Sequence, residues 1–281
     1  MKKISIIALL SFLLFSCKND NKEIDNNVDW IDPVFAKVLE ERGYIRDREN
    51  VTKSEVAKLE VVNVEGTSDS KGPIQSLRGI EYFTSLTKFN ANFNYIKEAD
   101  LNSNLNLREF HAEFNEISNL NVERCKNLED LRFQYNNVSG INLKNNSELV
   151  HLEISHNPIS ELDLSANSKL VNLMAYDNLL SDLDVSPCPL LSTLRVPGNK
   201  LTSLNLSNNP NLVTLECNSN LLPSIDISHN LSLVNFICDS NPGINGVFSV
   251  KAWFNSTAVP ENFTKEPWTY NGSQVEIDYY Q

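Results

Sequence analysis

Asparagine recurs every 21 residues through the middle of the chain, and this spacing limits the possible folds more than any other feature. Eight such residues in an unbroken series are not a chance arrangement, and a fixed period of about 20–50 residues is typical of solenoids and other stacked repeats. A 21-residue unit is too short to bury its own apolar side chains, so successive units must stack and share one core. The series is Asn94, Asn115, Asn136, Asn157, Asn178, Asn199, Asn220 and Asn241.

Apolar residues occupy fixed positions relative to each asparagine. Leucine stands eight residues before it in every unit, and leucine or phenylalanine stands five residues before it. From that second position the chain alternates apolar and polar residues, which is the pattern of a half-buried strand. Stacked strands lie about 4.8 Å apart, so the units predict one parallel sheet about 40 Å long. The two apolar series are Leu86, Leu107, Leu128, Leu149, Leu170, Leu191, Leu212 and Leu233, and Phe89, Phe110, Leu131, Leu152, Leu173, Leu194, Leu215 and Phe236.

A second, shorter alternation follows each asparagine by five to seven residues, as in Leu183-Asp184-Val185. It predicts a short strand on the opposite side of each unit, because 21 residues leave no room for a helix there. Another polar column stands ten residues after each asparagine. We therefore expect a flattened, nearly all-β solenoid in which side-chain amides tie backbone groups at two bends. The second column is Asn104, Cys125, Asn146, Asn167, Cys188, Asn209 and Asn230.

The places of the cysteines in this frame decide which of them could pair. Cys125 and Cys188 lie three units apart, about 14 Å by strand spacing, which is too far for a disulfide. Cys217 and Cys238 occupy the same inward position in neighbouring units and are close enough to consider a bridge. Parallel neighbours in register seldom meet the torsion angles of a disulfide, so we favour two buried free thiols over a bridge.

The repeat resembles that of the leucine-rich repeat family, in its short 21-residue bacterial class, and it covers more than half of the chain. The sequence as a whole is similar to leucine-rich repeat surface lipoproteins of the internalin-like or bacteroidete type. This resemblance implies a mostly β solenoid of about eight coils, with a parallel sheet on one side and a second sheet of short strands opposite. It also implies a protein that binds other proteins and is not an enzyme.

The start of the chain has the pattern of a targeting signal. Lys2 and Lys3 precede an apolar run over residues 4–15, which is too short to span a bilayer and is typical of a cleaved signal. The run ends in Leu-Phe-Ser-Cys, which resembles the bacterial lipobox, whose cysteine thiol accepts diacylglycerol. We interpret residues 1–16 as a lipoprotein signal peptide, Cys17 as the lipidation site and 17–27 as a flexible tether. This predicts a lipid-anchored outer-membrane protein at the cell surface; the alternative is an ordinary secretory signal with an incidental cysteine.

The residues before the repeats predict a small helical cap. The segment 32–43 opens with Asp-Pro and ends with Gly, as an amphipathic helix does, and Thr52 with Glu55 forms a capping box for a second helix. This pair resembles the EF-hand-like segment that precedes the repeats of some bacterial leucine-rich proteins. Arg46 and Arg48 stand where calcium ligands would lie, so we expect no calcium site.

The chain therefore divides into three parts after the tether. Residues 28–85 form the helical N-terminal cap and an irregular first coil, 86–243 form the leucine-rich repeats, and 244–281 form a C-terminal cap. A solenoid exposes apolar surface at its ends unless they are covered. The last segment is rich in aromatic residues, which we interpret as a cover for the final coil, with a ligand site there as the alternative.

Composition and motifs argue against several functions. The 24 basic and 36 acidic residues give a net charge of −12, which disfavours nucleic acid as a partner. The sequence has no GxSxG, HExxH or CxxC motif and no glycine-rich phosphate loop. His111 and His151 are expected on one sheet but two coils apart, about 10 Å, so one zinc ion could not bind both without another ligand. We therefore expect no enzymatic activity, no cofactor and no metal.

The outward positions of the sheet carry the candidate binding site, because the repeat does not dictate them. Rings precede the asparagine in four consecutive units and then stop. Aromatic, Arg and Met enrichment is typical of the centres of interfaces; alternatively, the rings stack on one another as a stabilising ladder. We expect a protein partner, with a glycan as the alternative ligand and a structural role in an outer-membrane complex as a third possibility. The candidate residues are Phe93, Phe114, Tyr135, His156, His111, Arg132, Glu153, Tyr176 and Arg195.

Overall fold

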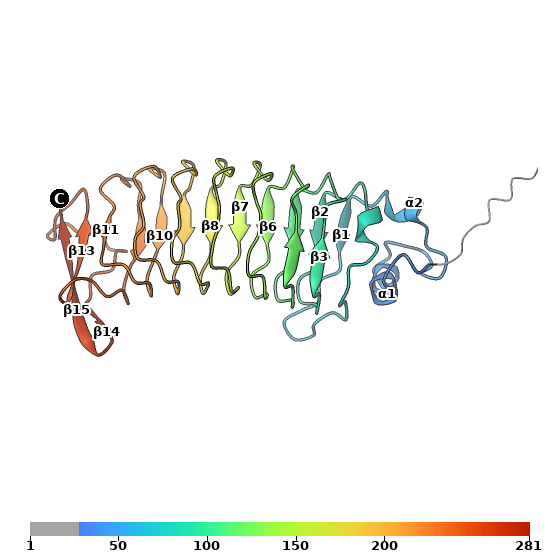
Figure 1. The fold of residues 1–281 in the computed structure, drawn as a ribbon, viewed down its shortest axis with the longest axis horizontal. Helices are drawn as coiled ribbons and strands as arrows, with labels where there is room; N and C mark the ends of the chain where they lie inside the picture. Colours follow the sequence, from blue (N-terminus) through green and yellow to red (C-terminus); the bar gives the residue numbers. More distant parts are fainter. Residues whose placement is uncertain (1–27) are drawn as a thin grey trace, which may run out of the picture.

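The computed structural model describes residues 28–281, which form one elongated solenoid (Figure 1). The short strands follow one another in a nearly straight row from the helical end to the C-terminal end (Figure 1). The predicted signal peptide at 1–16, the lipidation site Cys17 and the tether at 17–27 lie outside the described residues. Within the described part, no helix is both long and apolar enough to cross a membrane.

Nine parallel strands form the main sheet, and their order in the sheet follows the chain. From β2 onward, each strand is centred on the buried apolar residue that stands five positions before an asparagine. Neighbouring strands pair in register, so that Leu152 lies opposite Leu173. The predicted leucine-rich repeat solenoid is therefore confirmed. The strands are β1 (Val61–Asn63), β2 (Lys88–Asn90), β4 (Glu109–His111), β6 (Asp130–Arg132), β7 (His151–Glu153), β8 (Asn172–Met174), β9 (Thr193–Arg195), β10 (Thr214–Glu216) and β12 (Asn235–Ile237).

The repeated asparagine is buried in every coil and joins two coils by hydrogen bonds. The side-chain nitrogen of Asn157 donates to the carbonyl of Phe133 in the preceding coil and to that of Ile154 in its own coil, both at 3.1 Å. Its side-chain oxygen accepts from the backbone N–H of Val138 at 2.9 Å. A buried backbone group without a partner is costly, so these asparagines have a structural role. The same bonds recur at Asn115, Asn136, Asn199, Asn220 and Asn241.

The second polar column also joins neighbouring coils by hydrogen bonds, at the other bend. Asn146 donates to the carbonyls of Val122 and Cys125 in the preceding coil, at 3.0 and 2.8 Å. Where cysteine replaces asparagine, the thiol takes over part of this bonding: Cys125 Sγ lies 3.2 Å from the carbonyl oxygen of Leu101. All four cysteines of the described chain are buried and free, which confirms the interpretation of Cys217 and Cys238 as buried thiols.

The opposite side of the solenoid forms sheets only near its two ends. β3 (Glu98–Asp100) pairs with β5 (Asn119–Asn121), and β11 (Ser224–Asp226) pairs with β13 (Val247–Lys251). The four coils between them have no strand at this place, so the second sheet is less continuous than predicted. Their leucines, such as Leu183, are nevertheless buried, and adjacent coils are joined by single bonds such as Lys200 N–H to the Leu180 carbonyl. Side-chain packing therefore holds these coils with little help from a strand ladder.

The N-terminal cap contains the two predicted helices. Asp32 caps α1 (Pro33–Glu41) by accepting from two backbone N–H groups, and Thr52 caps α2 (Lys53–Val56). The reciprocal half of the expected capping box is not formed, because Glu55 Oε1 instead accepts from the backbone N–H of Arg46 at 3.3 Å. Phe35 of α1 stacks on Phe83 at 5.7 Å, just after the short 3-10 helix η1 (Ile80–Tyr82), and so closes the apolar end of the first coil.

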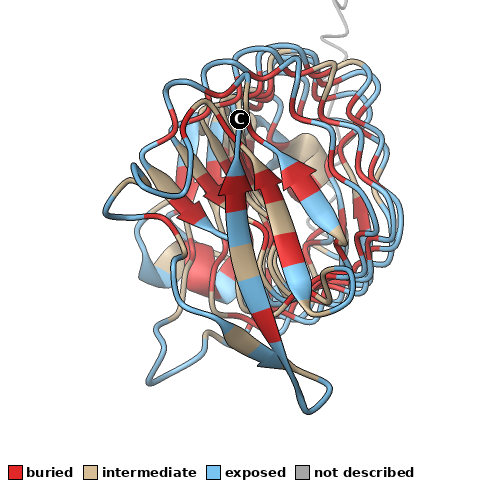
Figure 2. Ribbon diagram, turned by 90° about the vertical axis from the view of Figure 1, so that its left-hand side faces the viewer, coloured by how far each residue is buried: buried red, intermediate tan, exposed pale blue. Residues whose placement is uncertain are grey.

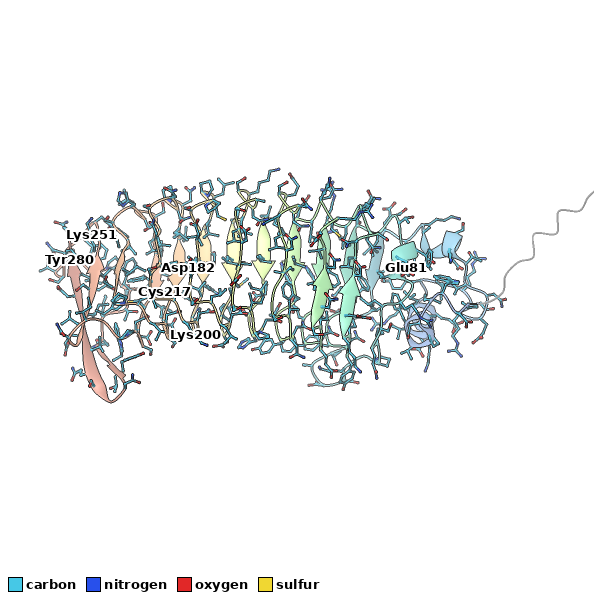
Figure 3. The ribbon with its side chains drawn as sticks, in the orientation of Figure 1. Glu81, Asp182, Lys200, Cys217, Lys251 and Tyr280 are labelled. Carbon is cyan, nitrogen blue, oxygen red and sulfur yellow. The ribbon has the colours of Figure 1, made fainter. Side chains whose placement is uncertain are left out.

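The C-terminal segment covers the last coil, as predicted. β15 (Ser273–Tyr280) pairs in parallel with β13 and in antiparallel with β14 (Trp268–Tyr270). Residues 262–264 extend the main sheet beyond β12, and Phe263 packs on Phe236 at 5.5 Å. In Figure 2 the strand that ends at the C-terminus changes between buried and exposed segments along its length, as a covering strand does. Lys251 and Tyr280 mark this end cap in Figure 3.

Candidate functional site

The predicted aromatic residues form one continuous stack along an edge of the main sheet. Each precedes a structural asparagine and has a left-handed backbone, with φ between 53° and 58°. From Phe93 to Phe114, Tyr135 and His156, successive ring centroids lie 4.6, 4.3 and 4.0 Å apart, and neighbouring planes are within 19° of parallel. We call these four residues the aromatic ladder. The rings therefore stack on one another, as the predicted alternative of a ladder requires.

The ladder ends where charge and a glycine replace the rings. His156 Nδ1 lies 3.2 Å from Asp177 Oδ2, and the Tyr176 ring meets the imidazole edge-on at 6.2 Å. In the next coil, a Cβ atom added to Gly198 would lie only 2.1 Å from Asp177 Oδ1. Gly198, with φ of 68°, therefore makes room for the carboxylate that pairs with the last ring.

The outward side chains of β4, β6, β7, β8 and β9, together with Glu113 and Tyr176 just after β4 and β8, lie beside the aromatic ladder. We call this surface the polar face. At its centre, Arg132 Nε and Nη2 donate to both oxygens of Asp130, at 2.8 and 2.7 Å. His111 Nε2 lies 3.4 Å from the same carboxylate. Burial alone would raise the pKa of Asp130, but hydrogen bonds from His111 and Arg132 outweigh it and hold this pKa far below its usual range.

Next to this group lie a buried carboxylate, Glu153, and a histidine with an unsatisfied ring nitrogen, His151. Glu153 is buried, and burial raises the pKa of its carboxyl group, an effect that Ser155 opposes. Burial also lowers the pKa of His151 despite the nearby Asp130, and its Nε2 has no hydrogen-bond partner among the described residues. A buried polar atom without a hydrogen-bond partner is stabilised when a partner molecule supplies the missing hydrogen bond.

The polar face becomes simpler toward the C-terminal end. Tyr176 contacts Met174, with its hydroxyl 3.3 Å from the sulfur, and Arg195 Nε lies 3.1 Å from Glu216 Oε1. Beyond Arg195 the outward positions are mostly small polar residues, such as Thr214, Asn218 and Asn235; Glu216 and the exposed Ile237 are the larger ones.

The structure thus brings the predicted residues together on one surface. The aromatic ladder forms its edge, His111, Arg132 and Glu153 lie on three consecutive strands, and Tyr176 and Arg195 continue along the next coils. The candidate binding residues predicted from the sequence did not include Asp130 and Asp177, although each carboxylate pairs with one of them. The signal was available: Asp130 and Arg132 share one strand and point outward together, and Asp177 continues the column of rings by 21 residues.

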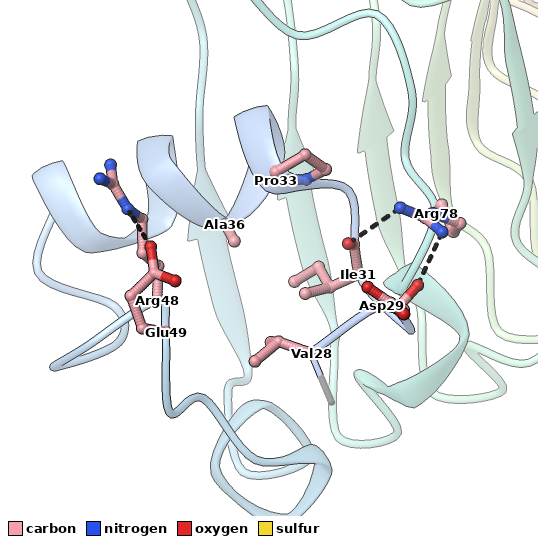
Figure 4. A pocket seen from close by; sticks show the side chains of 8 residues that line it. All are labelled: Val28, Asp29, Ile31, Pro33, Ala36, Arg48, Glu49 and Arg78. Carbon is pink, nitrogen blue, oxygen red and sulfur yellow. Dashed lines mark hydrogen bonds and ion pairs between the residues drawn. The ribbon is translucent and has the colours of Figure 1, made fainter. Parts of the chain in front are cut away.

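No other region of the described chain offers a better site. No cluster of three or more His, Cys, Asp or Glu residues there could hold a metal ion. A cavity of about 540 Å³ lies in the N-terminal cap between α1 and the first coil (Figure 4). Arg78 lines one side of it and donates to the carbonyls of Asp29 and Ile31 at 2.6 and 3.2 Å, which fastens the start of the described chain to the solenoid. These contacts give the cavity a structural explanation.

Comparisons with known proteins identify relatives in structure. No family model matches the sequence, and no curated protein matches it. The functional domain of InlJ from Listeria monocytogenes, which includes a cysteine ladder, superposes with a TM-score of 0.72 at 27% identity, over 79% of this chain and 51% of that one. This chain therefore spans about half the length of that domain.

Two further bacterial structures share the fold. YopM from Yersinia enterocolitica is 24% identical over 70% of this chain and 42% of its own, with a TM-score of 0.54. The leucine-rich repeat protein LIC12759 from Leptospira interrogans is 19% identical over 68% of this chain and 58% of its own, with a TM-score of 0.52. The structural neighbours are thus bacterial leucine-rich repeat proteins.

Proposed function

We propose that this chain is a lipid-anchored protein of the cell envelope that binds a protein partner through the polar face and the adjoining aromatic ladder. The observation that carries the proposal is the uneven outward surface of the main sheet. Its N-terminal half presents a column of rings, an arginine, a methionine and half-buried carboxylates. Its C-terminal half has no such column and presents mainly small polar residues, with Glu216 and Ile237 as the larger side chains. Aromatic, Arg and Met side chains are enriched at the centres of interfaces, and the leucine-rich repeat fold supports a binding role.

The proposed anchor depends on the sequence at Cys17. Acyl chains on this cysteine would hold the protein at the outer membrane, with residues 17–27 as the tether and the solenoid at the cell surface. Substitution Cys17→Ser should move the protein from the detergent phase to the aqueous phase in a phase-partitioning assay of cell extracts. Protease treatment of whole cells should remove the wild-type solenoid. Unchanged partitioning of Cys17→Ser would contradict the lipid anchor.

The geometry of the aromatic ladder favours a protein over a glycan. Carbohydrate binding by aromatic residues uses free ring faces, but the faces of Phe114 and Tyr135 are covered by their neighbours at 4.6, 4.3 and 4.0 Å. Tyr135 is 44% exposed, and because its neighbours cover both faces of the ring, the exposed part is mainly the rim of the ring. Rims of this kind pack against the side chains of a partner, as in other interfaces rich in tyrosine.

Cross-linking through Met174 tests the proposed surface without changing it. The chain has two methionines, Met1 in the predicted signal peptide and Met174 on the polar face. Cells grown with photoactivatable methionine should therefore carry the reactive group at position 174 of the mature protein. Irradiation of intact cells should yield a defined cross-linked protein, recovered through a C-terminal tag and identified by mass spectrometry.

The matched control moves the reactive residue to the opposite side of the solenoid. The double variant Met174→Leu, Asn205→Met carries its methionine on an exposed return segment and should give no such product. An equal product from both proteins, or none from the wild type, would contradict the proposed function. Recovery of a stoichiometric set of outer-membrane proteins would show instead a structural subunit of a larger complex.

A further inference from the structure

Glu153 differs from every other charged residue of the described chain in its burial. It lies on β7 in the middle of the polar face, and only 6% of its surface is exposed. It is the one charged side chain among residues 28–281 that is buried. No ion pair formed within these residues includes its carboxylate, whereas Asp130 on the neighbouring strand is paired with Arg132 at 2.7 Å. A buried carboxylate without a cation is a costly feature in the free protein.

The nearest cation does not remove this cost. Arg132 lies opposite Glu153 in the register of β6 and β7, but two of its nitrogens already donate to Asp130. Glu113 adds another negative charge nearby, which acts with burial to raise the pKa of Glu153. His151 does not compensate at neutral pH, because burial lowers its pKa. One arginine thus faces three carboxylates in this part of the polar face.

The surroundings of Glu153 also suit a particular cation. Met174 lies opposite Glu153 in the register of β7 and β8, and Tyr176 contacts Met174 through its hydroxyl at 3.3 Å. Tyr176 is close enough to Glu153 for the carboxylate to contribute, after burial, to its raised pKa. A guanidinium group donates two parallel hydrogen bonds to carboxylates and stacks on aromatic and thioether surfaces, whereas an ammonium group is a compact, strongly hydrated charge.

We propose that Glu153 and Glu113, flanked by Tyr176 and Met174, receive an arginine side chain of the protein partner. This inference rests on the proposed function and adds the chemical group that the polar face recognises. The incoming guanidinium supplies the charge that Glu153 lacks, so binding removes the cost of the unpaired carboxylate. Glu153 therefore destabilises the free protein and stabilises the complex.

Titration with short peptides tests this recognition without the natural partner. Acetylated, amidated tetra-arginine is titrated calorimetrically into the full-length chain in detergent, with tetra-lysine as the comparison. Tetra-arginine should bind more tightly than tetra-lysine, because only its groups can form paired bonds to the carboxylates. Glu153→Gln should weaken tetra-arginine binding about tenfold, as the loss of a charge-assisted pair does. Glu113→Gln should weaken it by a smaller factor.

The control removes the same charge from a place outside the polar face. Glu161 is exposed on the opposite side of the solenoid, so Glu161→Gln should change tetra-arginine binding less than about twofold. Glu153→Gln should also melt at or above the temperature of the wild type. Equal weakening by Glu153→Gln and Glu161→Gln would overturn the inference, because net charge would explain the binding. A lower melting temperature for Glu153→Gln would also overturn it, since Glu153 would then be a structural partner of Arg132.

Cross-linking separates a failure of this inference from a failure of the proposed function. A partner captured at Met174 should be recovered in much lower yield with Glu153→Gln than with the wild type. Capture of the same partner in equal yield by both proteins would overturn the arginine receptor and leave the binding surface in place. Absence of any captured partner with the wild type would overturn the proposed function itself.

Discussion

The main sheet has two halves that are alike inside and different outside. The first half, strands β2, β4, β6, β7 and β8, and the second half, strands β9, β10 and β12, bury the same column of leucine and phenylalanine and use the same asparagine hydrogen bonds. On the outside, the first half has the aromatic ladder and most of the polar face, and the second half has small residues such as Ser219. Packing of stacked coils dictates the inner pattern, so it is alike throughout. The outer pattern is free to differ, and it marks the half that we propose to bind.

The largest expected loss of stability comes from replacing a repeated asparagine, and it should be the same in both halves. Asn157→Ala and Asn220→Ala each leave buried backbone groups of two coils without partners. Each unsatisfied buried group costs about 1–3 kcal/mol, so each variant should lose about 3 kcal/mol or more in free energy of unfolding. Urea denaturation followed by circular dichroism measures both. A loss confined to one half would contradict a shared inner architecture.

Removing a ring from the first half should reduce stability more than the matching change in the second half. Phe114→Ala takes away stacking with Phe93 and Tyr135, and with the lost apolar contact this should cost about 2 kcal/mol. Ser219→Ala at the same position of a C-terminal coil should change the free energy of unfolding by less than about 0.5 kcal/mol. Both variants keep a non-glycine residue at positive φ, so backbone strain cancels in the comparison. Equal losses in urea denaturation would show that the ladder adds no stability.

Asp130 should make the first half sensitive to acid. Its folded pKa is depressed, so its contribution to stability is present above the unfolded pKa of about 3.9 and is lost as the pH falls through the folded pKa. Asp130→Asn should therefore cost about 1.5 kcal/mol at pH 7, in line with the loss of hydrogen bonds between charged groups, and less below pH 4. Unfolding curves of both proteins at several pH values measure this. A cost independent of pH would contradict the ion pair as its source.

Glu153 should have the opposite pH dependence and the smallest effect. Its folded pKa is raised, so ionisation is harder in the folded state, and stability falls as the pH rises from the unfolded pKa of about 4.3 through the folded pKa. Glu153→Gln removes this loss and should gain about 1 kcal/mol at pH 7 and nothing near pH 4. Differential scanning calorimetry at the two pH values measures the difference. A gain that is equal at both would contradict an ionised, unpaired carboxylate.

Much of the fold follows from the sequence because the repeat is local and periodic. The spacing of Asn94 to Asn241 places every strand of the main sheet from β2 to β12, and the positions of Cys217 and Cys238 follow from the same frame. The second sheet was only partly predictable. Alternation such as Leu183-Asp184-Val185 buries the leucine, but burial does not ensure the paired hydrogen bonds of a strand ladder.

The candidate site could be located from the sequence but not resolved in detail. A ring before each of four asparagines predicts a column, and the column is a stack because consecutive coils repeat in register. The burial of Glu153 has no such signal, since it depends on side chains from neighbouring strands that are many residues away in sequence. The accommodation of Asp177 by Gly198 is a contact of the same kind.

The central claim, that the first half of the sheet binds the partner, is tested most directly by moving the reactive methionine from one half to the other. The wild type carries it at Met174, and the double variant Met174→Leu, Thr214→Met carries it at an outward, half-buried position of β10. After irradiation of intact cells, we expect a cross-linked partner from position 174 and at most a trace from position 214. Equal or greater yield from position 214 would contradict the claim.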